Sequence, residues 1–349
     1  MTDLPGLDMI GLQEWLDTAH PELAADELRA EVIAGGRSNL TYAITGAKIP
    51  LVLRRPPLGH VLSSAHDMRR EHRVISALHR TTVPVPVAVD LVDDTAAGRI
   101  TGTPFFVMER APGTVVSRPR HNAAFTAAGV RALSVELIQH LADLHAVDPA
   151  SVGLADFGRP AGYLTRQLST WRRQLAASRS RELTALDALQ ARLAEHVPTT
   201  TRSGIVHGDY RLDNALVVGT GDQPHVSAIL DWEMATLGDP YVDLGIFALY
   251  WGIAELPGSF AGVVPSAVVP AAGYPSVDEL LEAYAAHAGS EIPDLGWYRA
   301  FAAYKLAVIL EGIHFRYLAG ETVGEGFEHL GDLVEPLARH GLQHEREKT

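Results

Sequence analysis

A polar stretch of eight residues, 207–214, constrains this chain more than any other part of the sequence. It reads His-Gly-Asp-Tyr-Arg-Leu-Asp-Asn and is followed by a short apolar run at residues 215–218. A further apolar run along the chain ends at Asp231. Short apolar runs bounded by polar residues are typical of buried strands. Polar groups at the ends of two strands can therefore bring Asp209, Asn214 and Asp231 to one place.

Each of these side chains suits one role in phosphoryl transfer. Asp209 precedes Asn214 by five positions, the separation of the catalytic Asp and Asn in the kinase pattern H-x-D-x-x-x-x-N. A carboxylate at Asp209 can orient and deprotonate an attacking hydroxyl group, and oxygen atoms of Asn214 and Asp231 are ligands that suit Mg²⁺. Taken alone, each residue fits a tight turn or a strand cap equally well. The agreement of order, spacing and strand context favours a catalytic site.

These segments resemble the aminoglycoside phosphotransferase family, which has a protein-kinase-like fold. The resemblance covers residues 30–320 and is closer to the phosphotransferase domain found at the front of some multidomain acyl-CoA dehydrogenases. That domain also shows the arginine-containing segments at 53–59 and 70–73. The matching motifs are His207-Gly208-Asp209 with Asn214, Leu230-Asp231-Trp232-Glu233, Gly238-Asp239-Pro240 and Asp243-Leu244-Gly245.

The resemblance implies an α+β fold of the protein-kinase type with two lobes. Residues 1–109 would form a small β-rich N-terminal lobe that covers the nucleotide. Residues 110–349 would form a larger helical C-terminal lobe with the catalytic loop, the Mg²⁺ site and the substrate site. Hydrophobic periodicity predicts strands at 32–34, 40–44, 51–54, 83–92 and 105–108, and helices at 9–28, 65–78, 132–145, 163–196, 243–251, 276–288, 295–318 and 327–340.

A turn with two consecutive glycines, Gly35 and Gly36, lies between the first two predicted strands, and Ser38 and Asn39 follow it. Backbone N–H groups in such a turn can cover phosphate groups. An ordinary hairpin has the same appearance, so the glycine pair alone is a weak signal. Its place before the next strand makes these residues candidates for nucleotide binding.

The predicted strand at 51–54 contains no lysine, although kinases hold the nucleotide phosphates with a lysine at the corresponding place. Period-two alternation puts Val52 and Arg54 on one face, and Arg54 is the candidate for the phosphate-facing role. The related dehydrogenase-linked domains are similar in having arginine here. Glu71, in the following predicted helix, is the candidate partner of Arg54. The alternative is that Arg54 is an exposed strand-end residue and Glu71 a solvated helix residue.

Residues 109–113 contain Pro and Gly after the last predicted strand of the first lobe, which is typical of a linker. In a kinase-like fold the backbone of this linker lies against the nucleotide base. Glu109 and Ala111 are therefore candidates for base binding.

Other polar residues near the 207–214 stretch have supporting roles. His207 is interpreted as a brace of the loop rather than a proton carrier. Arg211 either stabilises charge that develops during transfer or pairs with Asp213. The resemblance implies that Asp243 braces the His207 loop, whereas Asp239 is expected only to cap the following helix.

Composition excludes several classes of function and location. A net charge of −13 argues against nucleic acid as the main partner, because phosphate backbones need a positive surface. The absence of cysteine excludes disulfides, thiolate nucleophiles and cysteine-based zinc sites. The first residues do not resemble a secretory signal, and the apolar stretch at 261–272 is too short to span a bilayer. We expect a cytoplasmic protein without membrane insertion, and the oligomeric state stays open.

These observations favour a phosphotransferase that uses ATP, or alternatively GTP, with Mg²⁺ and acts on a hydroxyl group of a small molecule. The substrate is expected over the helical lobe, with residues 255–275 as a mobile lid. The resemblance allows aminoglycosides, macrolides, choline-like alcohols or hydroxyacyl-CoA thioesters, and the dehydrogenase-linked likeness favours a hydroxyacyl or other lipid-like acceptor. Two other classes stay open: a catalytically weak nucleotide-binding regulatory module and a metal-dependent hydrolase.

Overall fold

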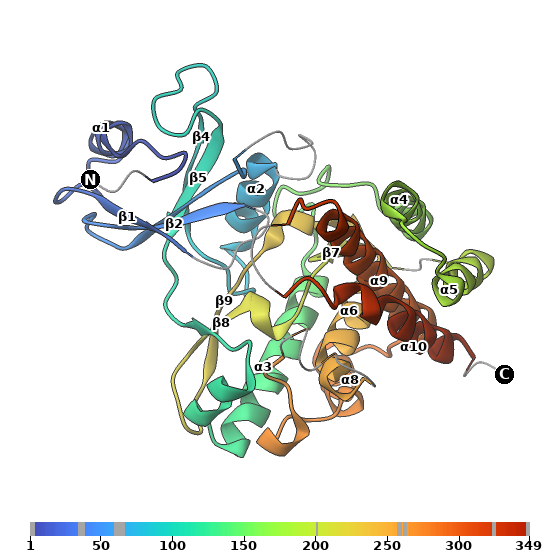
Figure 1. Ribbon diagram of the computed structural model, residues 1–349. Helices are drawn as coiled ribbons and strands as arrows, with labels where there is room; N and C mark the ends of the chain where they lie inside the picture. The colour runs from blue at the N-terminus through green and yellow to red at the C-terminus, as the bar shows by residue number, and fades with distance from the viewer. Residues whose placement is uncertain are drawn as a thin grey trace. The chain divides into compact units, whose positions relative to one another are not determined.

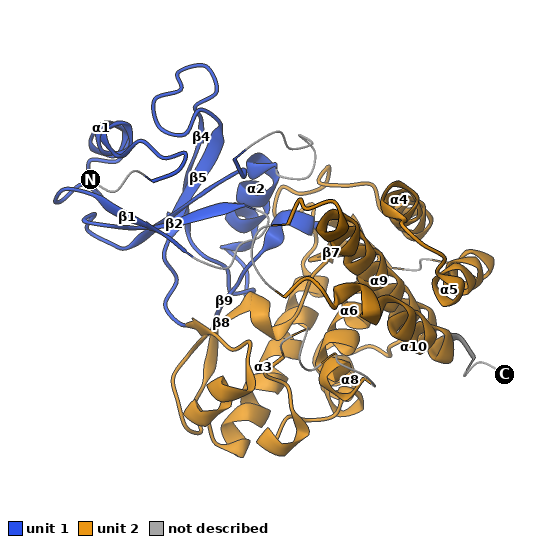
Figure 2. Cartoon of the chain, in the orientation of Figure 1, with its two compact units in different colours: residues 1–113, 227–235 blue, residues 114–226, 236–349 orange. Residues whose placement is uncertain are grey.

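A computed structural model describes residues 4–33, 39–58, 67–199, 202–256, 260, 264, 266–322 and 326–346. The chain divides into two compact units (Figure 2). Unit 1 consists of Met1–Gly113 and Ser227–Ala235, and unit 2 consists of Thr114–Val226 and Thr236–Thr349. The sequence prediction put all of residues 110–349 in the second lobe. The segment Ser227–Ala235, which carries Asp231, belongs instead to unit 1.

An antiparallel sheet of five strands in the order β1-β2-β3-β5-β4 is the framework of unit 1 (Figure 1). Five strands were predicted for this region and five are present, although the first begins at Arg29, before the predicted start at residue 32. The fourth begins later than predicted, because Pro84 and Pro86 have no N–H to donate to a ladder. The strands are β1 (Arg29–Val32), β2 (Leu40–Thr45), β3 (Leu51–Arg55), β4 (Ala88–Asp93) and β5 (Pro104–Glu109).

One face of this sheet forms a hydrophobic core with helix α1 (Met9–Ala19). Alternation along β3 puts Leu51 and Leu53 into this core, where burial stabilises each by about 1.5–3 kcal/mol. Arg55 is also buried, and it donates to the carbonyls of Gly6 and Thr101 at 2.5 and 3.1 Å. Arg54 consequently belongs to the opposite face, as the alternation predicts.

Helix α2 (Met68–Leu78) carries a carboxylate on its buried side. Asp67 caps its first turn by accepting from the N–H of Arg69 at 3.0 Å. Met68, Ile75 and Leu78 are buried, and Glu71 falls in the same stripe of helical spacing with 1% of its surface exposed. The spacing of the helix therefore explains why Glu71 is buried.

Seven α-helices make up most of the described part of unit 2 (Figure 1). Helix α9 packs against α4, α5, α6 and α10. The predicted helical region 163–196 consists of two helices, and residues 327–333 before α10 contain a 3-10 turn instead of α-helix. The helices are α3 (Ala127–Ala146), α4 (Tyr163–Ser178), α5 (Thr184–Glu195), α6 (Tyr241–Gly252), α8 (Val277–Ala288), α9 (Gly296–Leu318) and α10 (Val334–Arg346).

Close helix packing explains one glycine of the Asp-Leu-Gly motif. A Cβ atom at Gly245 of α6 would lie 2.4 Å from the backbone oxygen of Tyr298 in α9. The two helix backbones approach so closely that only glycine fits without a shift. In the described part of the chain, no helix is both long and apolar enough to cross a membrane.

Short strands flank the 207–214 stretch in unit 2. Strand β7 (Gly204–Val206) pairs with β10 (Thr236–Gly238), and it ends immediately before His207. The 3-10 turn η2 (Leu212–Asn214) leads into β8 (Ala215–Val218), which pairs with β6 (Thr114–Val115). Strand β9 (His225–Ile229) then carries the chain from unit 2 into unit 1. The strand predicted at residues 215–218 is confirmed.

Candidate active site

The loop after β7 brings two of the predicted site residues together. The side-chain amide of Asn214 donates to the backbone oxygen of Asp209 at 2.8 Å and to its carboxylate at 2.9 Å. The turn η2 makes this contact, because it folds the chain back over the five positions between the two residues. Since the amide nitrogen of Asn214 is engaged, the amide oxygen is the atom that Asn214 offers to a cation.

Buried side chains from three helices form a hydrogen-bond network that holds this loop. Asp243 in α6 accepts from the backbone N–H groups of His207 and Gly208 at 2.7 and 2.8 Å. Its carboxylate lies 3.2 Å from Nε2 of His145 in α3, whose Nδ1 is 2.8 Å from the hydroxyl of Tyr284 in α8. Burial acts to raise the pKa of Asp243, but the hydrogen bond and charge of His145 hold it below the ordinary value. The predicted bracing of the loop by Asp243 is confirmed.

His207 also stabilises the loop, as predicted. It is fully buried, and its Nδ1 accepts from the backbone N–H of Asp209 at 3.2 Å. Asp239 caps α6 by accepting from the N–H of Tyr241 at 3.1 Å, which agrees with the expected capping role. It also accepts from the hydroxyl of Tyr298 at 2.9 Å, a contact that the sequence did not indicate.

Arg211 contacts both of the carboxylates considered for it. Its guanidinium lies 3.4 Å from Asp209 and 3.3 Å from Asp213, and it lies over the ring of Tyr250 at 4.6 Å. Burial raises the pKa of Asp213, although the charge of Arg211 opposes this. A small cavity adjoins Arg211 and is lined mainly by apolar and aromatic side chains. The lining is Arg211, Leu212, Asp213, Phe247, Tyr250, Trp251, Ser266, Ala267 and Val268.

In unit 1, Arg54 lies among carboxylates. The expected pair with Glu71 forms at 2.7 Å, and a carboxylate oxygen of Asp231 lies 3.6 Å from the same guanidinium. Burial raises the pKa of Glu71 to about 7, against the charge of Arg54 and with the charges of Asp231 and Glu233. Arg54 is therefore a largely buried cation between two acidic groups, not an exposed strand-end residue.

Asp231 has an unusual backbone conformation. Its φ of 64° is left-handed, and it is the one non-glycine residue with a positive φ in the described part of the chain. Such backbone strain is concentrated at functional sites. Its side chain is 36% exposed, and its buried Oδ1 is the oxygen that lies 3.6 Å from the guanidinium of Arg54. Asn39 donates to Glu233, two positions along the chain, at 3.0 Å.

The remaining predicted nucleotide contacts are less defined. Gly35, Gly36 and Ser38 lie outside the described residues, as does part of the predicted lid at 255–275. Glu109 ends β5 and donates its N–H to the oxygen of Val87 at 2.8 Å. Ala111 lies in the irregular segment that follows. For Glu109 and Ala111, nucleotide binding stays a prediction.

Sequence reasoning gave no site role to Lys305 or Tyr284. Lys305 in α9 donates to the backbone oxygen of Gly208 at 2.6 Å. A single lysine within a long apolar helix was a usable signal, because a charge at such a position needs a buried partner. Tyr284 gave no comparable signal.

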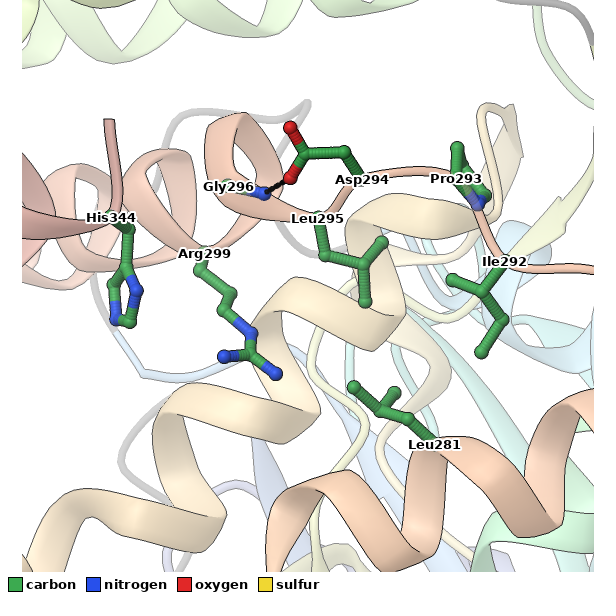
Figure 3. Close-up of a pocket in the computed structure, with 8 residues that line it drawn as sticks. All are labelled: Leu281, Ile292, Pro293, Asp294, Leu295, Gly296, Arg299 and His344. Carbon is green, nitrogen blue, oxygen red and sulfur yellow. Dashed lines mark hydrogen bonds between the residues drawn. The ribbon is translucent and has the colours of Figure 1, made fainter. Parts of the chain in front are cut away.

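A separate cavity of about 440 Å³ lies among α8, α9 and α10 and contains none of the predicted site residues. Figure 3 shows Arg299 and His344 near one end of it and Asp294 beside the first residue of α9. The N–H of Gly296 donates to Asp294 at 2.7 Å, so this helix start is already capped. The cavity is lined by Leu281, Ile292, Pro293, Asp294, Leu295, Gly296, Arg299 and His344.

Curated relatives match most of this chain. Acyl-CoA dehydrogenase family member 10 of Mus musculus is 35% identical over 87% of the chain, which corresponds to 28% of that protein. Acyl-CoA dehydrogenase family member 11 of Homo sapiens is 33% identical over 88% of the chain and 39% of that protein. The chain thus spans well under half the length of these relatives.

Solved structures share the fold. A protein of Ralstonia eutropha JMP134, provisionally described as an aminoglycoside phosphotransferase, is 31% identical with a TM-score of 0.80 over 98% of this chain and 99% of that one. The GDP complex of aminoglycoside 2'-phosphotransferase-IIIa has a TM-score of 0.60 at 16% identity, over 96% and 98% of the two chains. A thermostable mutant of aminoglycoside phosphotransferase APH(4)-Ia, in a ternary complex with AMP-PNP and hygromycin B, has a TM-score of 0.60 at 12% identity, over 97% and 99%.

The family model described as the phosphotransferase enzyme family matches residues 29–301. This range includes both the loop of Asp209 and the cluster of Arg54 and Asp231. The fold is of the protein-kinase-like type, with a β-sheet N-lobe and a helical C-lobe. The chain belongs to the phosphotransferase enzyme family.

Proposed function

We propose that this protein transfers the γ-phosphate of ATP, with GTP as the alternative donor, to a hydroxyl group of a small molecule. The observation that carries the proposal is the contact of Asn214 with Asp209 in a loop whose backbone is held by Asp243. Family membership and neighbours that bind GDP or AMP-PNP support the choice of a nucleotide. A carboxylate fixed by an amide is the arrangement that an attacking hydroxyl needs.

The proposal gives separate roles to several residues in and around the loop. Asp209 orients the acceptor hydroxyl and accepts its proton as the oxygen attacks phosphorus, and Asn214 fixes the direction of the Asp209 carboxylate. Arg211, which lies 3.4 Å from Asp209, stabilises negative charge on the transferred group. His207 and Asp243 hold the backbone and take no part in proton transfer.

The nucleotide side of the proposal uses Arg54, with Glu71 as its buried counter-charge, to hold the phosphates. The amide oxygen of Asn214 and the carboxylate of Asp231 would hold Mg²⁺, a donor set of hard oxygen atoms that fits this ion. The left-handed backbone of Asp231, a strained conformation that is concentrated at functional sites, supports this assignment. When bound, Mg²⁺ supplies positive charge to the β- and γ-phosphates.

We propose a hydroxyacyl or other lipid-like acceptor in preference to an aminoglycoside. Aminoglycosides are polycations and need acidic surroundings. The cavity beside Arg211 instead has Phe247, Tyr250, Trp251 and Val268 in its lining. Apolar side chains at this place favour an apolar group over a polycation near the acceptor hydroxyl, and relatives whose printed names refer to acyl-CoA chemistry support the same class.

A catalytically weak regulatory module is the second candidate. The observation that favours it is the position of Arg54, which is 3.6 Å from Asp231 and stands where kinases have a lysine. A guanidinium that pairs with the proposed Mg²⁺ ligand would oppose metal binding. The intact set of Asp209, Asn214 and Asp231 favours the enzyme.

Consumption of ATP and GTP with Mg²⁺ against a panel of hydroxyacyl-CoA thioesters, choline-like alcohols and aminoglycosides tests the proposal. Asp209→Asn is expected to lower kcat by about 10²–10⁴-fold, because it removes the proton acceptor. Asp332→Asn is the matched control, since this side chain is 72% exposed. Turnover that survives Asp209→Asn would remove Asp209 from the chemistry. Nucleotide binding without turnover on any acceptor would favour the regulatory module.

A further inference from the structure

A buried lysine reaches the candidate catalytic loop from helix α9. Lys305 is 8% exposed, and the neighbouring residues Tyr304, Leu306 and Ala307 are buried as well. Its Nζ donates to the backbone oxygen of Gly208 at 2.6 Å, the residue directly before Asp209. The same Nζ lies 5.4 Å from the ring centroid of Trp171 in α4. A contact across 97 positions of sequence thus joins α9 to the loop.

Such a lysine is costly to bury, and packing alone does not account for it. Removing an ammonium group from water is unfavourable unless charges and hydrogen bonds replace the lost hydration. Burial lowers the pKa of Lys305, the negative charges of Asp209 and Asp243 oppose this shift, and Arg211 adds to it. A methionine or leucine would fill the same volume without this cost. The ammonium group therefore serves something other than the packing of α9.

The peptide bond between Gly208 and Asp209 is held at both ends. Its oxygen accepts from Lys305 at 2.6 Å, and its N–H donates to Nδ1 of His207 at 3.2 Å. Gly208 has a φ of 87°, a left-handed conformation that side-chain-bearing residues rarely adopt. The N–H of Gly208 in turn donates to Asp243 at 2.8 Å. The plane of this peptide fixes the N–Cα bond of Asp209, about which the side chain is placed, so Lys305 helps to set the position of the Asp209 carboxylate.

We propose that Lys305 is a positioning residue, which locks the Gly208–Asp209 peptide plane and thereby aims the Asp209 carboxylate at the acceptor hydroxyl. The proposal rests on the phosphotransferase function proposed above. Lys305 does not touch the nucleotide or the acceptor. Its removal should therefore lower the rate of the chemical step and leave nucleotide binding intact.

Steady-state kinetics of Lys305→Met test this role, since methionine keeps the length of the chain and removes the charge and the donor. We expect kcat to fall by about 10–100-fold, because small misplacements of a catalytic group have effects of this size. The KM and Kd for the nucleotide should stay within about twofold of wild type, as Lys305 does not contribute to binding. Lys48→Met is the matched control, because Lys48 is exposed and remote from the loop in sequence.

Unchanged kcat in a folded Lys305→Met protein would overturn the inference. Equal losses in nucleotide affinity and kcat would also overturn it, because they would indicate general damage to the fold. Absence of turnover by the wild type with every acceptor would instead contradict the proposed function.

A second measurement leaves Lys305 in place. It therefore tests the inference even if Lys305→Met does not fold or the wild type shows no turnover. The chain has three lysines, Lys48, Lys305 and Lys348, so lysine labelled with ¹³C and ¹⁵N gives three side-chain signals. We expect one signal to show slow exchange of its Nζ protons and to shift when Asp209→Asn is introduced. Equal Nζ proton exchange rates for all three signals would contradict the contact of Lys305 with the loop. A slowly exchanging signal whose chemical shift does not change when Asp209→Asn is introduced would also contradict it.

Discussion

Asp231 combines a strained backbone with a carboxylate whose buried Oδ1 lies 3.6 Å from the guanidinium of Arg54. A non-glycine residue in the left-handed region costs on the order of 1–2 kcal/mol, and this cost persists only where a side chain has a use. Glycine would remove the strain and leave the turn after β9 intact. Folding stability thus favours glycine at position 231, whereas the proposed metal binding needs aspartate.

The two requirements can be separated by substitution. Asp231→Gly is expected to keep the free energy of unfolding or raise it by up to about 1 kcal/mol relative to Asp231→Asn, because it relieves the positive φ. Both variants should lose Mg²⁺-dependent nucleotide binding. Urea denaturation and titration of nucleotide with and without Mg²⁺ measure the two effects. Wild-type Mg²⁺ dependence in Asp231→Asn would exclude Asp231 as the ligand.

Glu71 predicts a specific dependence of stability on pH. Its pKa is about 7 in the folded protein against an ordinary value of 4.5, so the folded state holds a proton that the unfolded state releases between these values. The stability from this proton is fully present below pH 4.5 and lost as pH rises through 7. Glu71→Gln cannot titrate and should lack this slope.

The free energy of unfolding of wild type minus that of Glu71→Gln should therefore fall from pH 4.5 to pH 7, by up to about 3 kcal/mol. Chemical denaturation at a series of pH values measures the difference. Glu14→Gln, an exposed position in α1, is the control with no expected slope. Parallel curves for wild type and Glu71→Gln would show that Glu71 does not titrate in this range.

At the scale of elements, helix α6 presents Asp243 to a loop that has no regular structure of its own. The carboxylate is fully buried and contacts the backbone N–H groups of His207 and Gly208 together with His145. Both oxygens are engaged, so an amide in the same place would direct its NH₂ group at a donor. The loop therefore depends on a carboxylate at this position.

Asp243→Asn should lower the free energy of unfolding by about 3 kcal/mol at neutral pH, because it leaves a buried donor without an acceptor. It should also lower turnover, since the loop that carries Asp209 loses its brace. Urea denaturation and the ATP assay measure these effects, and Asp17→Asn is the exposed control. Because the pKa of Asp243 is lowered, its stabilisation is present above its ordinary value of 3.8 and lost as pH falls through the folded value. A stable Asp243→Asn with normal turnover would contradict the brace.

Local patterns predicted the elements that frame the site. Apolar runs predicted the strand at 215–218 and alternation predicted the face of Arg54, whereas the pairing of Glu71 with Arg54 was predicted from the resemblance to the kinase-like fold. Contacts between segments far apart in the sequence were not predictable, because the local sequence around one residue does not indicate which distant residue it contacts. Lys305 lies 97 positions from Gly208, and Tyr284 lies 139 positions from His145. His145 is buried, and its contact with Asp243 became apparent only from the fold.

At the scale of the whole molecule, the proposed metal ligands come from different units. Asn214 lies in unit 2 and Asp231 in unit 1, because the segment Ser227–Ala235 belongs with the sheet that carries Arg54. The sequence did not indicate this assignment, since it depends on long-range contacts such as the hydrogen bond from the N–H of Ile229 to the oxygen of Pro84 at 2.8 Å.

The comparison with curated relatives supports the proposed class of acceptor, and it does not assign a dehydrogenase reaction to this chain. This chain corresponds to 28% of one curated relative and 39% of another, so the dehydrogenase activity in their names does not transfer to it. What transfers is the phosphotransferase family, which matches residues 29–301.

The proposed magnesium site is tested most directly by a crystal structure with AMP-PNP and Mn²⁺, in which anomalous scattering locates the metal. We predict Mn²⁺ on the nucleotide phosphates, bound by the amide oxygen of Asn214 and the carboxylate of Asp231 at about 2.0–2.3 Å. A metal ion that contacts the phosphates but neither of these side chains would contradict the proposed site.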